Sequence, residues 1–197
     1  MTKLFDESAK GVYVIAVTPF TDGGALDLAS TDRMVDFYLE AGASGLTILG
    51  ILGEAPKLTA QESRTFVKRV LDRVAGRVPV VVGASAAGFA PMRELASDVM
   101  DMGASGVMVA PAPTLRTDEQ IVAYFDTVTA TFGDRCPWVL QDHPTSTGVQ
   151  MSTSVVLRIM KNSATCVMLK HEDSPGLAKL SAIRAQATKV KSGGCRY

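Results

Sequence analysis

The chain has 197 residues, of which 47% are hydrophobic and 20% charged; this is typical of a globular protein with a core and excludes a disordered chain. Its 20 Lys and Arg residues balance 20 Asp and Glu residues, so no basic surplus can neutralise a run of phosphates and we expect no nucleic-acid partner. No apolar run is long enough to cross a membrane and the amino terminus is charged, so the sequence predicts a cytoplasmic protein with no membrane association.

Short apolar segments rich in Val, Ile and Leu recur along the chain and predict β-strands. They begin at Val12, Leu46, Val78, Val107, Trp138 and Cys166. Their spacing of about thirty residues is the length of one strand-plus-helix unit. The intervening segments have helical periodicity, as at Phe66, Val67, Val70 and Val74. Strands and helices are therefore expected to alternate.

Turn and cap residues mark the ends of the predicted helices. Capping boxes are expected at Thr59 with Glu62 and at Thr117 with Gln120. The glycine-bounded turn of residues 42–45 returns at residues 103–106, which indicates an internal repeat, although small-residue turns also resemble one another by chance.

Continuously apolar strands that alternate with helices predict a parallel sheet covered on both faces. Two architectures fit. An open doubly wound sheet suits six strands, whereas a complete (β/α)8 barrel needs about 250 residues. Strand number favours the open sheet, and the motifs described next favour the barrel.

Lys170 is the most informative candidate for chemistry. It ends the apolar segment that begins at Cys166 and precedes the polar residues His171, Glu172 and Asp173. An amine held in apolar surroundings at a strand end has a lowered pKa and becomes a nucleophile towards a ketone. The alternative is a strand-end lysine that merely extends to solvent.

Two further segments follow predicted strands. Residues 50–54, GILGE, form a glycine-bounded turn whose backbone N–H groups could bind a carboxylate. Residues 141–144, QDHP, place His143 where α/β proteins carry their sites, since loops at the carboxyl ends of strands converge there. Each segment alone also fits an ordinary loop.

Together these motifs resemble the dihydrodipicolinate synthase and N-acetylneuraminate lyase superfamily from about Gly11 to Ala187. The matching motifs are Ala16 to Phe20, Gly50 to Glu54, Leu58 with Thr59 and Glu62, Pro79 to Gly83, Val109 to Pro111, Pro144 with Thr147 and Gly148, and Leu169-Lys170 before Glu172. Their order and spacing are more specific than any one of them.

The resemblance implies a TIM (β/α)8 barrel in which Lys170 forms a Schiff base with pyruvate or another 2-keto acid. It places the substrate carboxylate on the backbone amides of Ile51 and Leu52. We expect Lys170 and Gln141 to be the catalytic residues, and Gln141 and His143 to shape the specificity pocket. It implies a lyase or aldolase, or a dehydratase, that needs no metal or organic cofactor and forms a homo-oligomer.

The sequence departs from the family pattern at several positions. Gln141 replaces a proton-relaying tyrosine, and an amide cannot act as an acid or base at neutral pH. Ile51 and Leu52 replace hydroxyl residues, no tyrosine follows Pro111, and Ser146 replaces an arginine of the synthase branch. These changes argue against dihydrodipicolinate synthase itself and leave the proton-transfer group open.

The carboxyl-terminal part predicts an incomplete barrel. We expect about six βα units in residues 1–188 and an irregular tail in residues 189–197, with no seventh strand. The first and sixth strands would then be edges, Lys170 would be more hydrated, and activity would be low.

Two other functions remain open. A catalytically inactive truncated barrel could bind a ligand or partner without turnover, as the lost tyrosine suggests. An open-sheet nucleotide binder is the weakest alternative, because no glycine-rich phosphate loop follows the first strand. The scattered cysteines Cys136, Cys166 and Cys195 predict buried thiols, with neither a disulfide nor a metal site.

Overall fold

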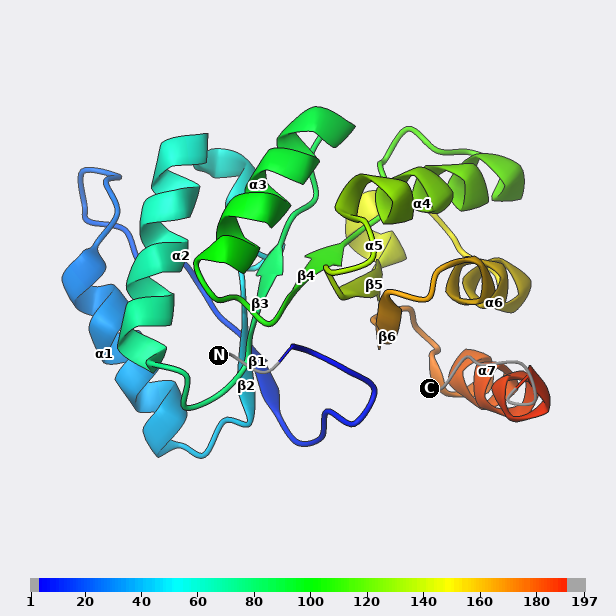
Figure 1. The fold of residues 1–197 in the computed structure, drawn as a ribbon, viewed down its shortest axis with the longest axis horizontal. Coiled ribbons are helices and arrows are strands. Elements are labelled where there is room, and N and C mark those ends of the chain that lie inside the picture. The colour runs from blue at the N-terminus through cyan, green and yellow to red at the C-terminus, as the bar shows by residue number, and fades with distance from the viewer. Residues whose placement is uncertain (1–3, 191–197) are drawn as a thin grey trace.

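The computed structural model describes residues 4–190, which form a curved six-stranded parallel sheet with helices around it (Figure 1). The strands are β1 (Tyr13–Ile15), β2 (Gly45–Ile48), β3 (Val80–Gly83), β4 (Gly106–Val109), β5 (Trp138–Asp142) and β6 (Cys166–His171). Each strand pairs with the next one in the chain, in the order β1-β2-β3-β4-β5-β6. A doubly wound sheet would reverse this order at a switch point, so that alternative is wrong.

The helices connect successive strands. They are α1 (Leu28–Glu40), η1 (Ala55–Lys57), α2 (Ala60–Val74), α3 (Phe89–Asp101), α4 (Asp118–Phe132), α5 (Pro144–Thr147), α6 (Thr153–Asn162) and α7 (Leu177–Val190). The described residues thus contain six βα units, which form a half-barrel. None of the helices in this part of the chain is both long and apolar enough to cross a bilayer.

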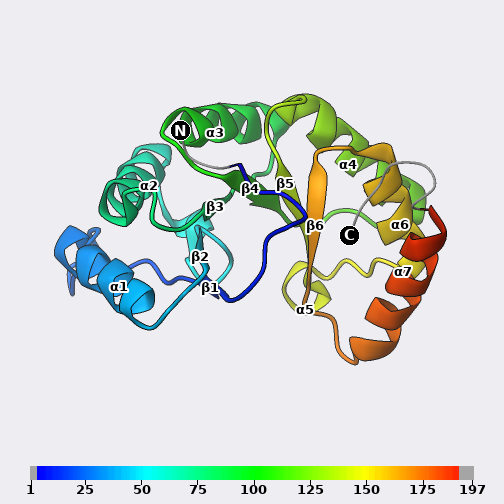
Figure 2. The ribbon, with the colours of Figure 1, turned by 60° about the horizontal axis from the view of Figure 1, so that its bottom comes forward.

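The long helices lie on the outer, convex side of the sheet (Figure 2). The prediction of a sheet covered by helices on both faces is therefore wrong. The physical reason is that right-handed crossovers made repeatedly in one direction put every helix on the same side. The amino-terminal segment instead runs across the concave side, where Phe5 joins the inner cluster and its N–H donates to the Ser105 carbonyl.

Side chains alternate between the two faces of the sheet, as the pleat of a strand requires. The outer face packs against the helices in one large core cluster, which includes Leu46, Val82 and Leu140. The inner face carries a smaller cluster, in which Val81 and Val139 are buried.

A bulge in β6 changes this alternation. Trp138 pairs with Cys166, but the next residue of β5, Val139, pairs with Met168, so Val167 is an extra residue. Both Val167 and Met168 pack on the inner cluster. Alternation resumes after the bulge, and as a result Lys170 lies on the inner face rather than the outer one.

The predicted helix starts are confirmed. Thr59 with Glu62 and Thr117 with Gln120 both form complete capping boxes, at the starts of α2 and α4. In the two repeated turns, Gly42 and Gly103 have positive φ angles and end their helices in the same way.

The two ends of the sheet are β1 and β6, so Lys170 lies on an edge strand of the described sheet, as predicted. Helix α7 continues to Val190, which includes the first two residues of the predicted irregular tail. Residues 191–197 of that tail lie outside the described residues.

Candidate functional site

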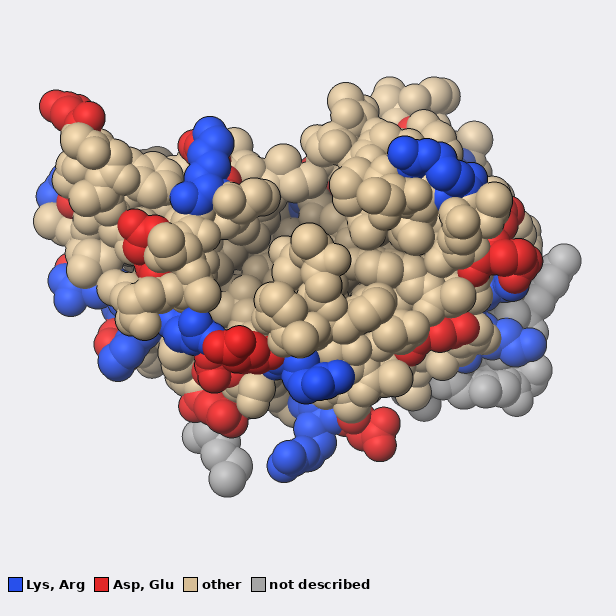
Figure 3. All heavy atoms as spheres, turned by 90° about the horizontal axis from the view of Figure 1, so that it is seen from above, with Lys and Arg blue, Asp and Glu red and all other residues tan. Residues whose placement is uncertain are grey.

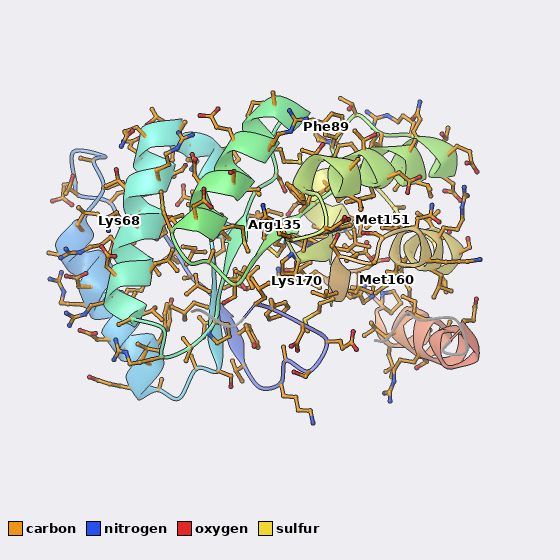
Figure 4. The ribbon with its side chains drawn as sticks, viewed as in Figure 1. Lys68, Phe89, Arg135, Met151, Met160 and Lys170 are labelled. Carbon is orange, nitrogen blue, oxygen red and sulfur yellow. The ribbon has the colours of Figure 1, made fainter. Side chains whose placement is uncertain are left out.

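Polar side chains gather where β5 and β6 end, in two groups separated by the sheet. Register pairs Gln141 with Lys170 and Asp142 with His171. Because neighbouring residues of a strand face opposite sides, the first pair points inward and the second outward. Figure 4 labels Lys170 beside β6, on the side of the strand opposite Met160, which belongs to the outer helix α6.

The inner trio consists of Gln141, Lys170 and Glu172. Lys170 Nζ donates to Glu172 Oε1 at 2.5 Å, and Gln141 Nε2 donates to the same oxygen at 2.9 Å. Burial opposes the charge of Glu172, but the hydrogen bonds from Lys170 and Gln141 outweigh it, so the pKa of Glu172 lies below its ordinary value. The trio holds an ammonium and a carboxylate in direct contact.

The surroundings of Lys170 differ from the sequence expectation. Its side chain is 21% exposed and is paired with a carboxylate, so the expectation of an amine among apolar groups alone is wrong. The reason is that Glu172, two residues further on, extends along the same face. The alternative of a lysine that only extends to solvent also does not fit, because the amine has this fixed partner.

His143 lies just beyond β5 and is the N-cap residue of the short helix α5. Its ring Nδ1 is buried and has no hydrogen-bond partner among the described residues. Burial raises the pKa of Glu172, the hydrogen bonds from Lys170 and Gln141 lower it, and an electrostatic interaction with the nearby His143 ring is the smallest of the effects that lower it. His143 therefore belongs to the surroundings of the inner trio.

The turn after β2 is held in an unusual backbone conformation. Leu49, which precedes the turn, and Glu54, its last residue, both have positive φ angles. The Thr18 hydroxyl donates to the Gly53 carbonyl at 2.6 Å. A Cβ on Gly83 would lie 1.9 Å from the Leu49 carbonyl oxygen, so only glycine lets the turn pack this closely on β3.

Ile51 and Leu52 occupy the tip of this turn, and their side chains are exposed. In the part of the chain that the structure describes, neither backbone N–H makes a hydrogen bond. No hydrogen bond or ion pair between described residues joins this turn to the inner trio. The structure thus brings Gln141, Lys170 and His143 together, and places Ile51 and Leu52 beyond the end of β2, which β3 and β4 separate from β5 in the sheet.

The outer trio consists of Asp142, His171 and Lys179. Asp142 is fully buried, and its Oδ2 accepts hydrogen bonds from His171 Nδ1 at 2.8 Å and from Lys179 Nζ at 2.6 Å. Lys179 comes from α7, so this network fastens the last described helix to β5 and β6. Removal of one partner from such a buried pair is expected to destabilise the fold, because it would leave an uncompensated buried charge.

A groove of about 480 Å³ opens beside the loops that follow β2, β3 and β4. Figure 3 shows the molecule from above, with a hollow in the middle of a largely uncharged face and most Lys, Arg, Asp and Glu side chains towards its margins. Leu49, Pro111 and Tyr124 are among the groove residues. Lys170 is not, so the groove and the inner trio are separate features.

The sequence alone singled out neither Glu172 nor Lys179 as a site residue. Glu172 had a usable signal, since residues two apart in a strand share a face. Lys179 had none, because its partner Asp142 is 37 residues earlier in the chain. Cys136 and Cys166 are both buried, as predicted, and burial raises the pKa of the Cys136 thiol to about 11; Cys195 lies outside the described residues.

Comparison with known proteins gives consistent matches. The model of the dihydrodipicolinate synthetase family matches residues 8–188. The 4-hydroxy-tetrahydrodipicolinate synthase of Coxiella burnetii is 30% identical over 186 residues, which are 93% of this chain and 62% of that protein.

Solved structures agree. The crystal structure of dihydrodipicolinate synthase from Rhodopseudomonas palustris is 50% identical with a TM-score of 0.92, and the match covers 99% of this chain and 64% of that one. YagE, a prophage protein from E. coli K12 solved in complex with pyruvate, is 25% identical with a TM-score of 0.82, over 94% of this chain and 62% of that one. The chain spans less than two thirds of the length of each of these proteins.

Proposed function

The chain belongs to the dihydrodipicolinate synthetase family, and from that premise we propose that it is a lyase or aldolase that acts on a 2-keto acid such as pyruvate through a Schiff base at Lys170. The observation that carries this proposal is the Lys170 amine, which lies on the inner face of the sheet at the carboxyl end of β6. Barrel enzymes place their chemistry at this end of the strands. The pyruvate bound to YagE supports the substrate class.

In this proposal the neutral Lys170 amine attacks the keto carbon, and loss of water leaves a protonated imine. The imine draws electrons from the bond β to it, so that a carbon–carbon or carbon–oxygen bond can break or form. The carboxylate of the substrate binds the backbone N–H groups of Ile51 and Leu52, whose donors have no partner within the described residues.

Gln141 and His143 have supporting roles in the proposal. Gln141 is nearly completely buried and its amide is fixed on Glu172, so it orients that carboxylate and forms part of the pocket wall. His143 faces the same region and shapes the part of the pocket that reads the rest of the substrate. The preserved lysine with its fixed carboxylate favours turnover over the alternative of an inactive ligand-binding barrel.

The test is reductive trapping with pyruvate and borohydride, followed by intact-mass measurement and peptide mapping. Trapping accumulates the adduct, so even slow imine formation is detected. We expect one reduced pyruvyl adduct on Lys170, and none in Lys170→Ala. Lys68→Ala removes an exposed lysine on α2 and should trap as the native chain does. No adduct, or an adduct on another lysine, would refute the Schiff-base proposal.

A further inference from the structure

A Schiff-base enzyme needs a group that moves protons beside the reacting amine. At position 141 the chain has a glutamine, whose amide does not titrate near neutral pH. Two other carboxylates lie near the end of β6, but Asp142 is on the outer face and Asp173 is 3.4 Å from Lys179. Among the described residues, Glu172 is the carboxylate that contacts Lys170.

The geometry around Glu172 suits proton transfer. Lys170 and Gln141 both donate to Oε1, whereas Oε2 accepts no hydrogen bond from any described residue. The Glu172 side chain is 33% exposed, so water or a substrate oxygen can reach it. One oxygen is therefore fixed on the amine while the other is open to the reacting molecule.

We propose that Glu172 is a catalytic acid–base residue that moves the protons of imine formation at Lys170. This inference rests on the proposed function and adds the proton-transfer group that the sequence left open. Glu172 qualifies as catalytic because its Oε1 is in hydrogen-bond contact with the amine that reacts.

The proposed steps balance in protons and electrons. Glu172 first takes one proton from the Lys170 ammonium, which leaves a neutral amine and a carboxylic acid. The amine lone pair forms a bond to the keto carbon, and the carbonyl π electrons move to its oxygen. Transfer of a second proton from nitrogen to that oxygen gives the carbinolamine.

Glu172 then gives its proton to the carbinolamine hydroxyl. The carbon–oxygen bond breaks, water leaves with the bonding electrons, and the nitrogen lone pair forms the C=N bond. The ammonium began with three protons; two now belong to water and one to the imine nitrogen. Glu172 ends as a carboxylate, ready for the reverse sequence when product is released by hydrolysis.

The ion pair could instead act only by holding Lys170 as an ammonium, and this role predicts an effect of opposite sign. Removal of the carboxylate would then free the amine and make trapping faster. If Glu172 transfers protons, its removal makes trapping slower, although the amine has lost its partner. The direction of the change therefore separates the two roles.

The experiment measures the rate of pyruvate trapping by cyanoborohydride in the native chain and in Glu172→Gln. The glutamine keeps the size of the side chain but cannot transfer protons, so we expect a rate about 10²-fold lower, in the range for general acid–base catalysis. Asp173→Asn removes a neighbouring carboxylate that does not contact Lys170, and it should trap at the native rate. Circular dichroism of each variant checks that it is folded.

A second variant keeps the test decisive if Glu172→Gln fails to fold. Glu172→Asp retains a carboxyl group one methylene shorter, and we expect a rate between those of the native chain and the glutamine variant. An unchanged or faster rate in either variant would overturn the role of Glu172. A native chain that forms no adduct would instead refute the Schiff base itself, so the two failures are distinguishable.

Discussion

The inner and outer faces of β5 and β6 carry similar polar groups in different surroundings. On each face a lysine donates to a carboxylate, Lys170 to Glu172 inside and Lys179 to Asp142 outside. The inner carboxylate is partly exposed, whereas the outer one is fully buried beneath α7. The two faces thus place the same kind of ion pair in different surroundings: the inner pair is accessible to solvent, and the outer pair is closed off where it joins α7 to the sheet.

The largest effect is expected from Asp142→Ala on the outer face. Removal of this carboxylate leaves His171 and the Lys179 ammonium without their buried partner, which should lower the free energy of unfolding by about 3–5 kcal/mol. Urea unfolding measures the loss. Glu172→Gln on the inner face should change the free energy of unfolding by about 1 kcal/mol or less, since the Lys170–Glu172 pair is partly exposed. If the two variants lost equal free energy of unfolding, the two carboxylates would not differ in their contribution to stability.

A smaller difference in stability is expected between substitutions in the apolar clusters of the two faces. Val82 and Val81 are adjacent in β3, both are buried, and they point into the outer and inner clusters respectively. Val82→Ala should cost about 2 kcal/mol, from lost burial plus a cavity among the helices. Val81→Ala should cost about 1 kcal/mol, because the smaller inner cluster can relax. Thermal or urea unfolding of this matched pair measures the difference, and the reverse order would be inconsistent with it.

The smallest expected effect is on how the free energy of unfolding depends on pH. The pKa of Glu172 is lower in the folded chain than its ordinary value, so its charged form stabilises the fold above the unfolded pKa of about 4.3. That contribution is lost as the pH falls through the folded pKa. Unfolding experiments on the native chain and Glu172→Gln should therefore differ most near neutral pH and converge at low pH. A difference that grew on acidification would contradict the lowered pKa.

Much of the fold could be predicted from local patterns. Apolar segments located the six strands that the structure describes, and hydroxyl residues three positions before Glu62 and Gln120 located two helix starts. These signals act within a few residues. The side of the sheet that the helices cover was predicted wrongly. It depends on the handedness of successive crossovers, which no single segment of sequence encodes.

The site was predicted less completely, for physical reasons that differ between residues. Lys170 stood out because a lysine is rare in an apolar strand segment. The contact of Gln141 with Glu172 depends on the register between β5 and β6, and that of Lys179 with Asp142 depends on the docking of a helix. Whether Ile51 and Leu52 bind a carboxylate stays a prediction, which trapping at different pyruvate concentrations in Gly53→Ala would test through a weaker apparent affinity.

The bulge at Val167 gives β6 one residue more than β5 over the same stretch. A one-residue deletion there would restore simple alternation and exchange the sides, turning Lys170 towards the helices and His171 towards the concave surface. The face on which Lys170 lies is consequently encoded by strand length as well as by residue type. A homologue that retains the lysine but lacks the extra residue would carry the amine on the outer face of the sheet, among the helices.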